Sequence, residues 1–159
     1  MKHPILSLLV ALAILSPALG ADWSIVSTRA TAFKPEEQTS KDGQDFWLNI
    51  TLRNDSKVTQ YIRGLKPGWF LIEALIQPPQ SEAWERQKIG FDQKLTWIAI
   101  KPGEEIKLLR RQSIADAGRP MKLTFSTALS EAAPEESVIV LDPFKVPSPT
   151  KEKLRSPAK

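Results

Sequence analysis

The feature that most constrains the fold is an alternation of apolar and polar residues with a period of two, repeated in short runs along the chain. Residues 46–52, FWLNITL, are apolar at every second position, with Trp47, Asn49 and Thr51 between them. Residues 121–127, MKLTFST, repeat this pattern. Because successive side chains of a strand point to opposite faces, such runs predict strands that are buried on one face.

Similar short runs recur between turn residues. We predict further strands at 23–33, 58–62, 95–100, 106–111 and 138–141. Residues 69–77, WFLIEALIQ, are apolar on both faces, and a central strand buried on both sides is favoured over a helix because proline and glycine bracket the run. Residues 82–91 are ambiguous. Seven or eight strands spaced roughly ten residues apart predict an all-β chain folded as an antiparallel β-sandwich.

A tight turn and a pair of arginines mark the stretch from 95 to 112. Residues 101–104, KPGE, have proline and glycine where a type II turn requires them. Arg110 and Arg111 follow at the end of the next run. Neighbours in a regular strand point to opposite faces, so the pair holds one acidic group only if the strand ends or bulges there. We interpret it as a strand end with solvated charges, leading into the loop that contains Asp116.

The order of these segments resembles a known type of domain. It runs from LNITLRNDS (48–56) through WFLIEALI (69–76) and IKPGEEIKL (100–108) to MKLTFS (121–126). This layout resembles the immunoglobulin- or fibronectin-like domains of exported bacterial proteins, and it is similar to the domain of the BsuPI-type proteinase inhibitors. The resemblance covers about residues 45–127 and implies an immunoglobulin-like sandwich. It implies no reactive residues, because fold transfers better than function.

The N-terminus has the layout of a secretory signal peptide. A basic start, an uncharged apolar run at 4–15 and small residues up to Gly20 predict cleavage after Gly20. The run is short for a permanent membrane span, although a retained anchor is the alternative. We therefore expect a signal peptide at 1–20, a sandwich domain at 21–144, and a disordered basic tail rich in proline and lysine at 145–159. The mature protein is expected in the periplasm or secreted.

The residue inventory excludes several chemistries. The only histidine is His3, inside the predicted signal peptide, and the chain has no cysteine. This excludes a Ser-His-Asp triad, a cysteine nucleophile and the usual zinc ligands. We therefore expect that the chain is not an enzyme and binds no cofactor. A calcium or magnesium site made of carboxylates alone stays open. The excess positive charge lies in residues 145–159 and not on the domain, which does not favour a nucleic-acid partner.

Four residues are the sequence candidates for contact with a partner: Trp47, Trp69, Arg110 and Arg111. Exposed tryptophan and arginine are typical of protein interfaces, so we expect another envelope or extracellular protein as partner. Trp97 is expected in the core. A carbohydrate-binding module is one alternative, and a proteinase inhibitor with a reactive loop at 34–45 or 112–120 is another. The tail is expected to make at most a weak contact with an anionic surface.

Overall fold

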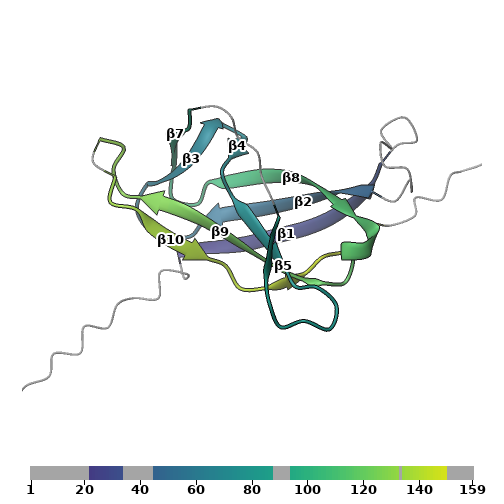
Figure 1. Ribbon diagram of the computed structural model, residues 1–159. Coiled ribbons are helices and arrows are strands. Elements are labelled where there is room, and N and C mark those ends of the chain that lie inside the picture. Colours follow the sequence, from purple (N-terminus) through teal and green to yellow (C-terminus); the bar gives the residue numbers. More distant parts are fainter. Residues whose placement is uncertain (1–21, 34–44, 88–93, 133, 150–159) are drawn as a thin grey trace, which may run out of the picture.

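Two antiparallel β-sheets form a sandwich in the computed structural model, which describes residues 22–33, 45–87, 94–132 and 134–149. The eleven strands are β1 (Trp23–Ala32), β2 (Asp45–Asn54), β3 (Gln60–Lys66), β4 (Trp69–Phe70), β5 (Glu73–Ile76), β6 (Glu85–Gln87), β7 (Thr96–Ile100), β8 (Glu105–Ser113), β9 (Pro120–Ala128), β10 (Ser137–Val140) and β11 (Phe144–Lys145). The predicted all-β sandwich is confirmed (Figure 1). The additional strands have two or three residues, too few for a periodic pattern to be recognised.

The two sheets differ in size. The small sheet has the order β1-β2-β8, with β1 and β8 at its edges. The large sheet has eight strands built around β3, β9 and β5, and both β10 and β11 pair with β9. Strand β6 pairs with β5, and β7 pairs with β3. The small sheet therefore covers only part of the inner face of the large one.

The core lies between the sheets and follows from the period-two pattern. On β2, the residues at every second position from Phe46 to Asn54 are buried, and β9 has the same alternation from Met121. Trp23 is the tryptophan of the core. Its ring meets Phe125 edge to face, with 5.3 Å between centroids, and its Nε1 donates to Gln60 Oε1 at 2.6 Å. This hydrogen bond ties β1 of the small sheet to β3 of the large sheet.

Two expectations about apolar segments are corrected. Trp97 is not in the core: it lies beside Arg63 across the β3–β7 ladder, with the guanidinium carbon 5.1 Å from the ring centroid. Residues 69–77 are extended rather than helical, as predicted, but they form β4 and β5 and bury only alternate side chains. The apolar pattern was misread because Leu71 and Leu75 are only half-buried on the outer side.

The turn at 101–104 is present, with Gly103 at φ 75° and the Glu104 amide donating to the Lys101 carbonyl oxygen at 3.0 Å. The strands on either side diverge: β7 joins the large sheet and β8 the small one. The turn is therefore a crossing between the sheets. Strand β8 continues through the arginine pair, ends at Ser113 and leads into the loop that contains Asp116, as predicted.

Asn54 links the two connections that pass between the sheets at one end of the sandwich, β2–β3 and β7–β8. Its fully buried amide donates to the carbonyl oxygens of Val58 and Ile100, each at 3.0 Å. Its Oδ1 accepts from the amide of Ser56 at 3.0 Å and from that hydroxyl at 2.6 Å. Its backbone carbonyl oxygen accepts from the Gly103 amide at 2.7 Å. All hydrogen-bonding groups of the side chain are satisfied, so the β2–β3 and β7–β8 connections are held together.

The boundary predicted at 144–145 is also corrected. Phe144 and Lys145 form β11 on β9, and Val146 is buried in the core. The amide of Val146 donates to the Arg119 carbonyl oxygen at 2.9 Å. The prediction missed Val146 because the predicted tail as a whole contains few apolar residues. Residues 145–149 therefore belong to the domain, while the signal-peptide prediction (1–20) and the rest of the predicted tail (150–159) lie outside the described residues.

Replacing Asn54 tests how much the sandwich depends on this junction. Asn54→Ala is expected to lower the free energy of unfolding by about 2–4 kcal/mol, because it removes the four hydrogen bonds of a buried amide, including the donor to the Ile100 carbonyl oxygen. Ser56→Ala, which keeps the buried amide, is expected to lower it by about 0.5–1.5 kcal/mol. Urea unfolding followed by tryptophan fluorescence measures both. Equal losses in the two variants would contradict the central role of Asn54.

Candidate functional site

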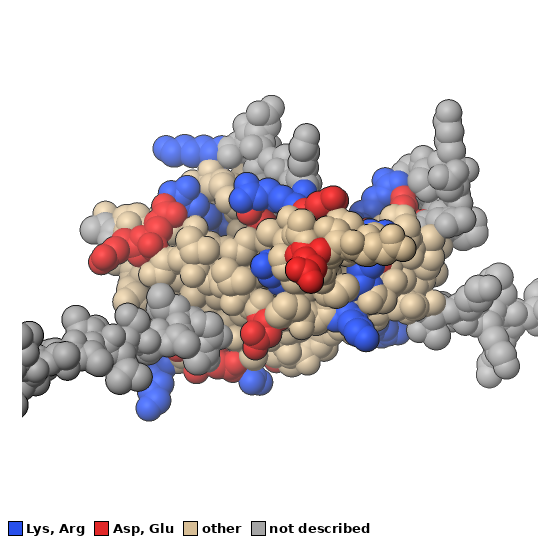
Figure 2. Space-filling model, turned by 60° about the horizontal axis from the view of Figure 1, so that its bottom comes forward, with Lys and Arg blue, Asp and Glu red and all other residues tan. Residues whose placement is uncertain are grey.

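The open long side of the sandwich carries a trough between β1 of the small sheet and β10–β11 of the large sheet. Its main hollow, of about 830 Å³, is lined by residues 23–28 on one wall and 140–144 on the other. A smaller hollow of about 350 Å³ is lined by Asp22 and Ile139, which are the chain neighbours of Trp23 and Val140 in the main hollow. We call the two hollows together the side trough. Strands β1 and β10 lie along the lower side of the molecule in Figure 1, and Figure 2 turns that side forward.

Exposed apolar side chains are concentrated along the side trough. Val26 is 42% exposed and Val140 52% exposed in the main hollow. Leu129, 72% exposed, lines the smaller hollow together with Val58. Val26 sits at a β-bulge, where the β1–β2 register shifts between Ile25 and Ser27. Clustered exposed apolar residues are typical of a surface that binds something, and Figure 2 shows broad uncharged surface between scattered charges on this side.

The charged residues that line the side trough are all acidic. They are Asp22, Glu135 and Asp142, and no lysine or arginine lines either hollow. None of the three forms an ion pair within the described part of the chain. Elsewhere on the described surface five acids pair with arginines, namely Asp45, Asp55, Glu73, Asp116 and Glu136. The side trough therefore has a mixed lining, in which exposed apolar side chains alternate with hydroxyl groups and acids, and its negative charge is not compensated.

The opposite long side is closed by polar side chains. Gln112 of β8 and Gln87 of β6 exchange two amide hydrogen bonds, at 2.9 and 3.0 Å. Arg110 donates from Nη1 to the Ile72 carbonyl oxygen at 3.0 Å and reaches Gln87 Oε1 from Nη2 at 3.4 Å. We call these groups the Arg110 clamp. It joins the β8 edge of the small sheet to Ile72, directly before β5, and to β6 of the large sheet.

Arg110 is a cation without a carboxylate partner among the described residues. Its Nε–H is buried and donates to no hydrogen-bond acceptor there. Burial lowers the pKa of its guanidinium, because the charged form loses solvation. The side chain therefore holds the clamp with neutral carbonyl groups only. The prediction that Arg110 is a solvated residue at a strand end is wrong, because its side chain points between the sheets.

Arg111 and Trp47 lie together on the outer face of the small sheet. They are direct neighbours in the β2–β8 register. Arg111 forms an ion pair with Asp45, and its guanidinium carbon lies 5.6 Å from the Phe33 ring centroid. Phe33 also packs on Trp47, with 4.7 Å between ring centroids. In this cluster the charge of Arg111 is paired with Asp45, and the two aromatic rings pack on each other.

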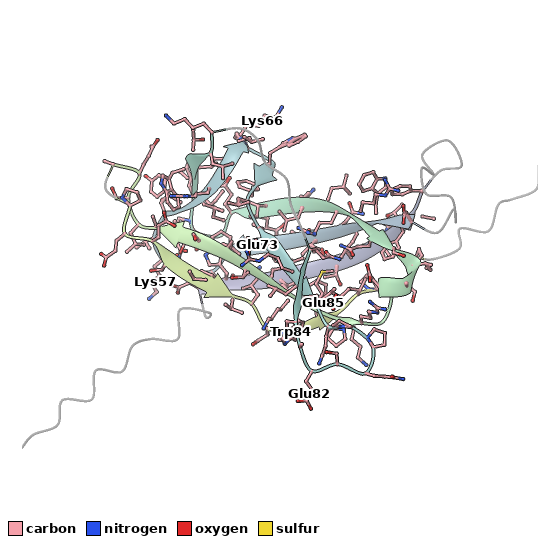
Figure 3. The ribbon with its side chains drawn as sticks, viewed as in Figure 1. Lys57, Lys66, Glu73, Glu82, Trp84 and Glu85 are labelled. Atoms are coloured by element: carbon pink, nitrogen blue, oxygen red, sulfur yellow. The ribbon has the colours of Figure 1, made fainter. Side chains whose placement is uncertain are left out.

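Trp69 lies on the other sheet. It is 55% exposed in β4, and the ammonium of Lys66 is 5.4 Å from its ring centroid. Trp84 has a similar neighbour, the ammonium of Lys122 at 4.3 Å. Figure 3 shows Lys66 at the top of the view and Trp84 near the bottom. The sequence candidates are thus dispersed over three places, and Trp47 and Trp69 do not share one surface.

Within the described ranges, no group of three or more acidic or histidine side chains is placed to hold a metal ion. Within the same ranges, no helix has the length and apolar character needed to cross a membrane.

The residues of the side trough were not recognised in the sequence. The run 138–141, VIVL, was correctly predicted as a strand, and its alternation hides Ile139 and Leu141 in the core while exposing Val138 and Val140. The sequence does not say that this strand is an edge. Edge position is a tertiary property, so the alternation of apolar residues does not report it.

Comparisons with known proteins give a fold and no function. No family model matches the chain, and no curated protein matches it. A structural-genomics target, SoR45, superposes with a TM-score of 0.52 and 14% identity over 89% of this chain and 98% of its own. A Bordetella pertussis protein given the name ApaA has a TM-score of 0.48 and 15% identity, covering 81% of this chain and 95% of its own. A β-glucosidase from Listeria innocua has a TM-score of 0.30 and 10% identity, covering 75% of this chain and 15% of that enzyme. The first likeness shows a shared β-rich fold, and the lower scores carry no weight.

The stability of the Arg110 clamp can be measured. Arg110→Met is expected to change the free energy of unfolding by less than about 1 kcal/mol, because the cost of burying an unpaired cation offsets its hydrogen bonds. Leu108→Ala, on the same face of β8, is expected to lower it by about 2–5 kcal/mol through cavity formation. Urea unfolding compares them. A loss near that of Leu108→Ala would show that the clamp is a main source of stability.

Proposed function

We propose that this chain is an exported, non-catalytic interaction module that binds another protein of the cell envelope or extracellular space through the side trough. Export follows from the predicted signal peptide, with cleavage near Gly20. The resemblance to immunoglobulin-like domains of exported proteins is consistent with this role. The observation that carries the proposal is a row of exposed apolar side chains with unpaired acids, set between two strand edges.

The geometry supports a protein ligand more than a sugar. Sugars stack on flat aromatic faces, but Trp69 and Trp84 each have a lysine ammonium over the ring and lie apart from each other. Trp47 is packed against Phe33. The aromatic residues of the described surface therefore do not form a common platform. Valine and leucine in the side trough offer apolar area without stacking geometry, which suits a polypeptide.

An inhibitor loop receives less support. The first candidate loop, 34–45, lies outside the described residues except for Asp45, which begins β2. The other, 112–120, is a short 3₁₀ turn at Ile114–Asp116 between β8 and β9. The Gly118 amide donates to the Val146 carbonyl oxygen at 2.8 Å, and Arg119 pairs with Asp116. A segment bound in this way to the domain does not resemble a projecting loop that enters a protease.

Affinity capture with matched variants tests the proposed surface. The mature protein, residues 21–159, is immobilised and exposed to envelope extract from its host. Val140→Lys is expected to reduce capture of the specific partner about tenfold or more, corresponding to a loss of about 1.4 kcal/mol or more. Leu109→Lys is the control, because Leu109 is 59% exposed on the outer face of the small sheet. It is expected to capture like the wild type.

Two outcomes contradict the proposal. Equal capture by the Val140→Lys and Leu109→Lys variants, both with unchanged melting temperature, would show that the side trough is not the binding surface. Loss of capture on deleting residues 150–159, together with loss at high salt, would assign binding to the basic C-terminal segment, since solvent-exposed charge pairs are screened by salt.

A further inference from the structure

The walls of the side trough are strand edges with free backbone groups. Strand β1 is the edge of the small sheet and pairs only with β2 among the described strands. Strand β10 pairs only with β9 in the same part of the chain. An edge strand presents a row of unpaired N–H and C=O groups, which can pair with a further strand. Extended peptides bind other proteins by this strand addition, with side-chain pockets supplying specificity.

Of the two edges, β1 is better suited to accept a strand. It has ten residues, six of which line the main hollow consecutively, at 23–28. The facing edge β10 has four residues and is followed by Pro143, which has no N–H to donate. Six residues of strand correspond to about 20 Å. The bulge at Val26 interrupts the regular edge but places an apolar side chain in the channel.

The charges indicate the chemistry of the occupant. Asp22 and Glu135 line the smaller hollow at one end, where β1 and β10 begin. Asp142 lies beyond the end of β10 in the main hollow, past Val140. An occupant that satisfies this arrangement has basic residues near its two ends and apolar residues between them, facing Val26 and Val140.

We propose that the occupant is an extended polypeptide segment of a partner protein, apolar in its centre and basic at its ends, that adds to β1 as a fourth strand of the small sheet. This inference rests on the proposed function. The added backbone pairs with the free edge of β1, alternate apolar side chains pack against the valines, and the basic side chains neutralise the three acids. The side trough then recognises the apolar pattern and the charge of the added strand, and not one particular residue.

The test uses a defined probe, the capped peptide Lys-Lys-Val-Thr-Val-Thr-Val-Lys-Lys, titrated against the mature protein. N-methylation removes backbone donors from one edge of a strand at a time. One peptide is methylated at the valines and another at the threonines. Because alternate amides of a strand point to opposite edges, one methylated peptide is expected to bind at least about tenfold more weakly and the other within about threefold of the parent. Amides of β1 are expected to exchange more slowly with solvent in the complex.

A charge exchange tests the acids. Asp142→Lys is expected to weaken binding of the parent peptide about tenfold. The same variant is expected to bind more tightly a peptide that has glutamate in place of lysine. Glu105→Lys is the matched control, because Glu105 begins β8 on the opposite side and lines neither hollow. It is expected to leave both affinities unchanged.

Three results would overturn the strand proposal: no binding of the parent peptide, equal weakening by both methylation patterns, or no slowing of exchange in β1. If partner capture still depends on Val140 in that case, the proposed function survives and only the mode of binding is wrong. If capture is indifferent to Val140→Lys, the proposed function itself fails.

Discussion

The amide of Asn54 holds together the two connections by which the chain passes between the sheets at one end of the sandwich. Its two N–H groups satisfy carbonyl oxygens from 58 and 100, which belong to separate connections. Without it the Ile100 carbonyl oxygen would lose a buried donor, which is unfavourable by roughly 1–3 kcal/mol, while the Val58 carbonyl oxygen would keep the Ser56 hydroxyl as a donor. With no cysteine in the chain, this alignment depends on hydrogen bonds and apolar packing alone. The position of β1 relative to the large sheet depends in addition on the hydrogen bond from Trp23 to Gln60.

The unequal sheets explain why one long side is open. Three strands do not cover eight, and the sandwich is closed on the β8 side by the Arg110 clamp, which ties β8 to β6. On the other side Trp23 bonds to Gln60 inside the core, and nothing of this kind joins the described edges of β1 and β10. The closed side fixes the separation of the sheets. The open side is thereby a preformed channel, which reduces the ordering that an occupant must undergo on binding.

The sequence predicted the strands well and the site poorly, for physical reasons. Alternation at 46–52 and 121–127 reports one buried face, so β2 and β9 were recognised, and the proline–glycine turn at 101–104 was recognised from backbone preferences. Alternation does not report which strands pair, so the two strands around that turn were not assigned to different sheets. Arg110 followed the inward positions of β8, but a charged residue at such a position was interpreted as a strand end. Edge status depends on strand order, and the side trough depends on edge status.

The same acids that favour a basic occupant disfavour self-association through the trough. If two copies added edge to edge through β1, each would bring Asp22, Glu135 and Asp142 toward the three acids of the other. Like charges brought face to face repel each other, although salt screens this repulsion for solvent-exposed groups such as Glu135 and Asp142. The bulge at Val26 further disturbs the flat geometry that identical edges need. Charge and bulge together therefore leave the β1 edge open to a foreign basic strand while opposing the aggregation that an exposed apolar edge otherwise invites.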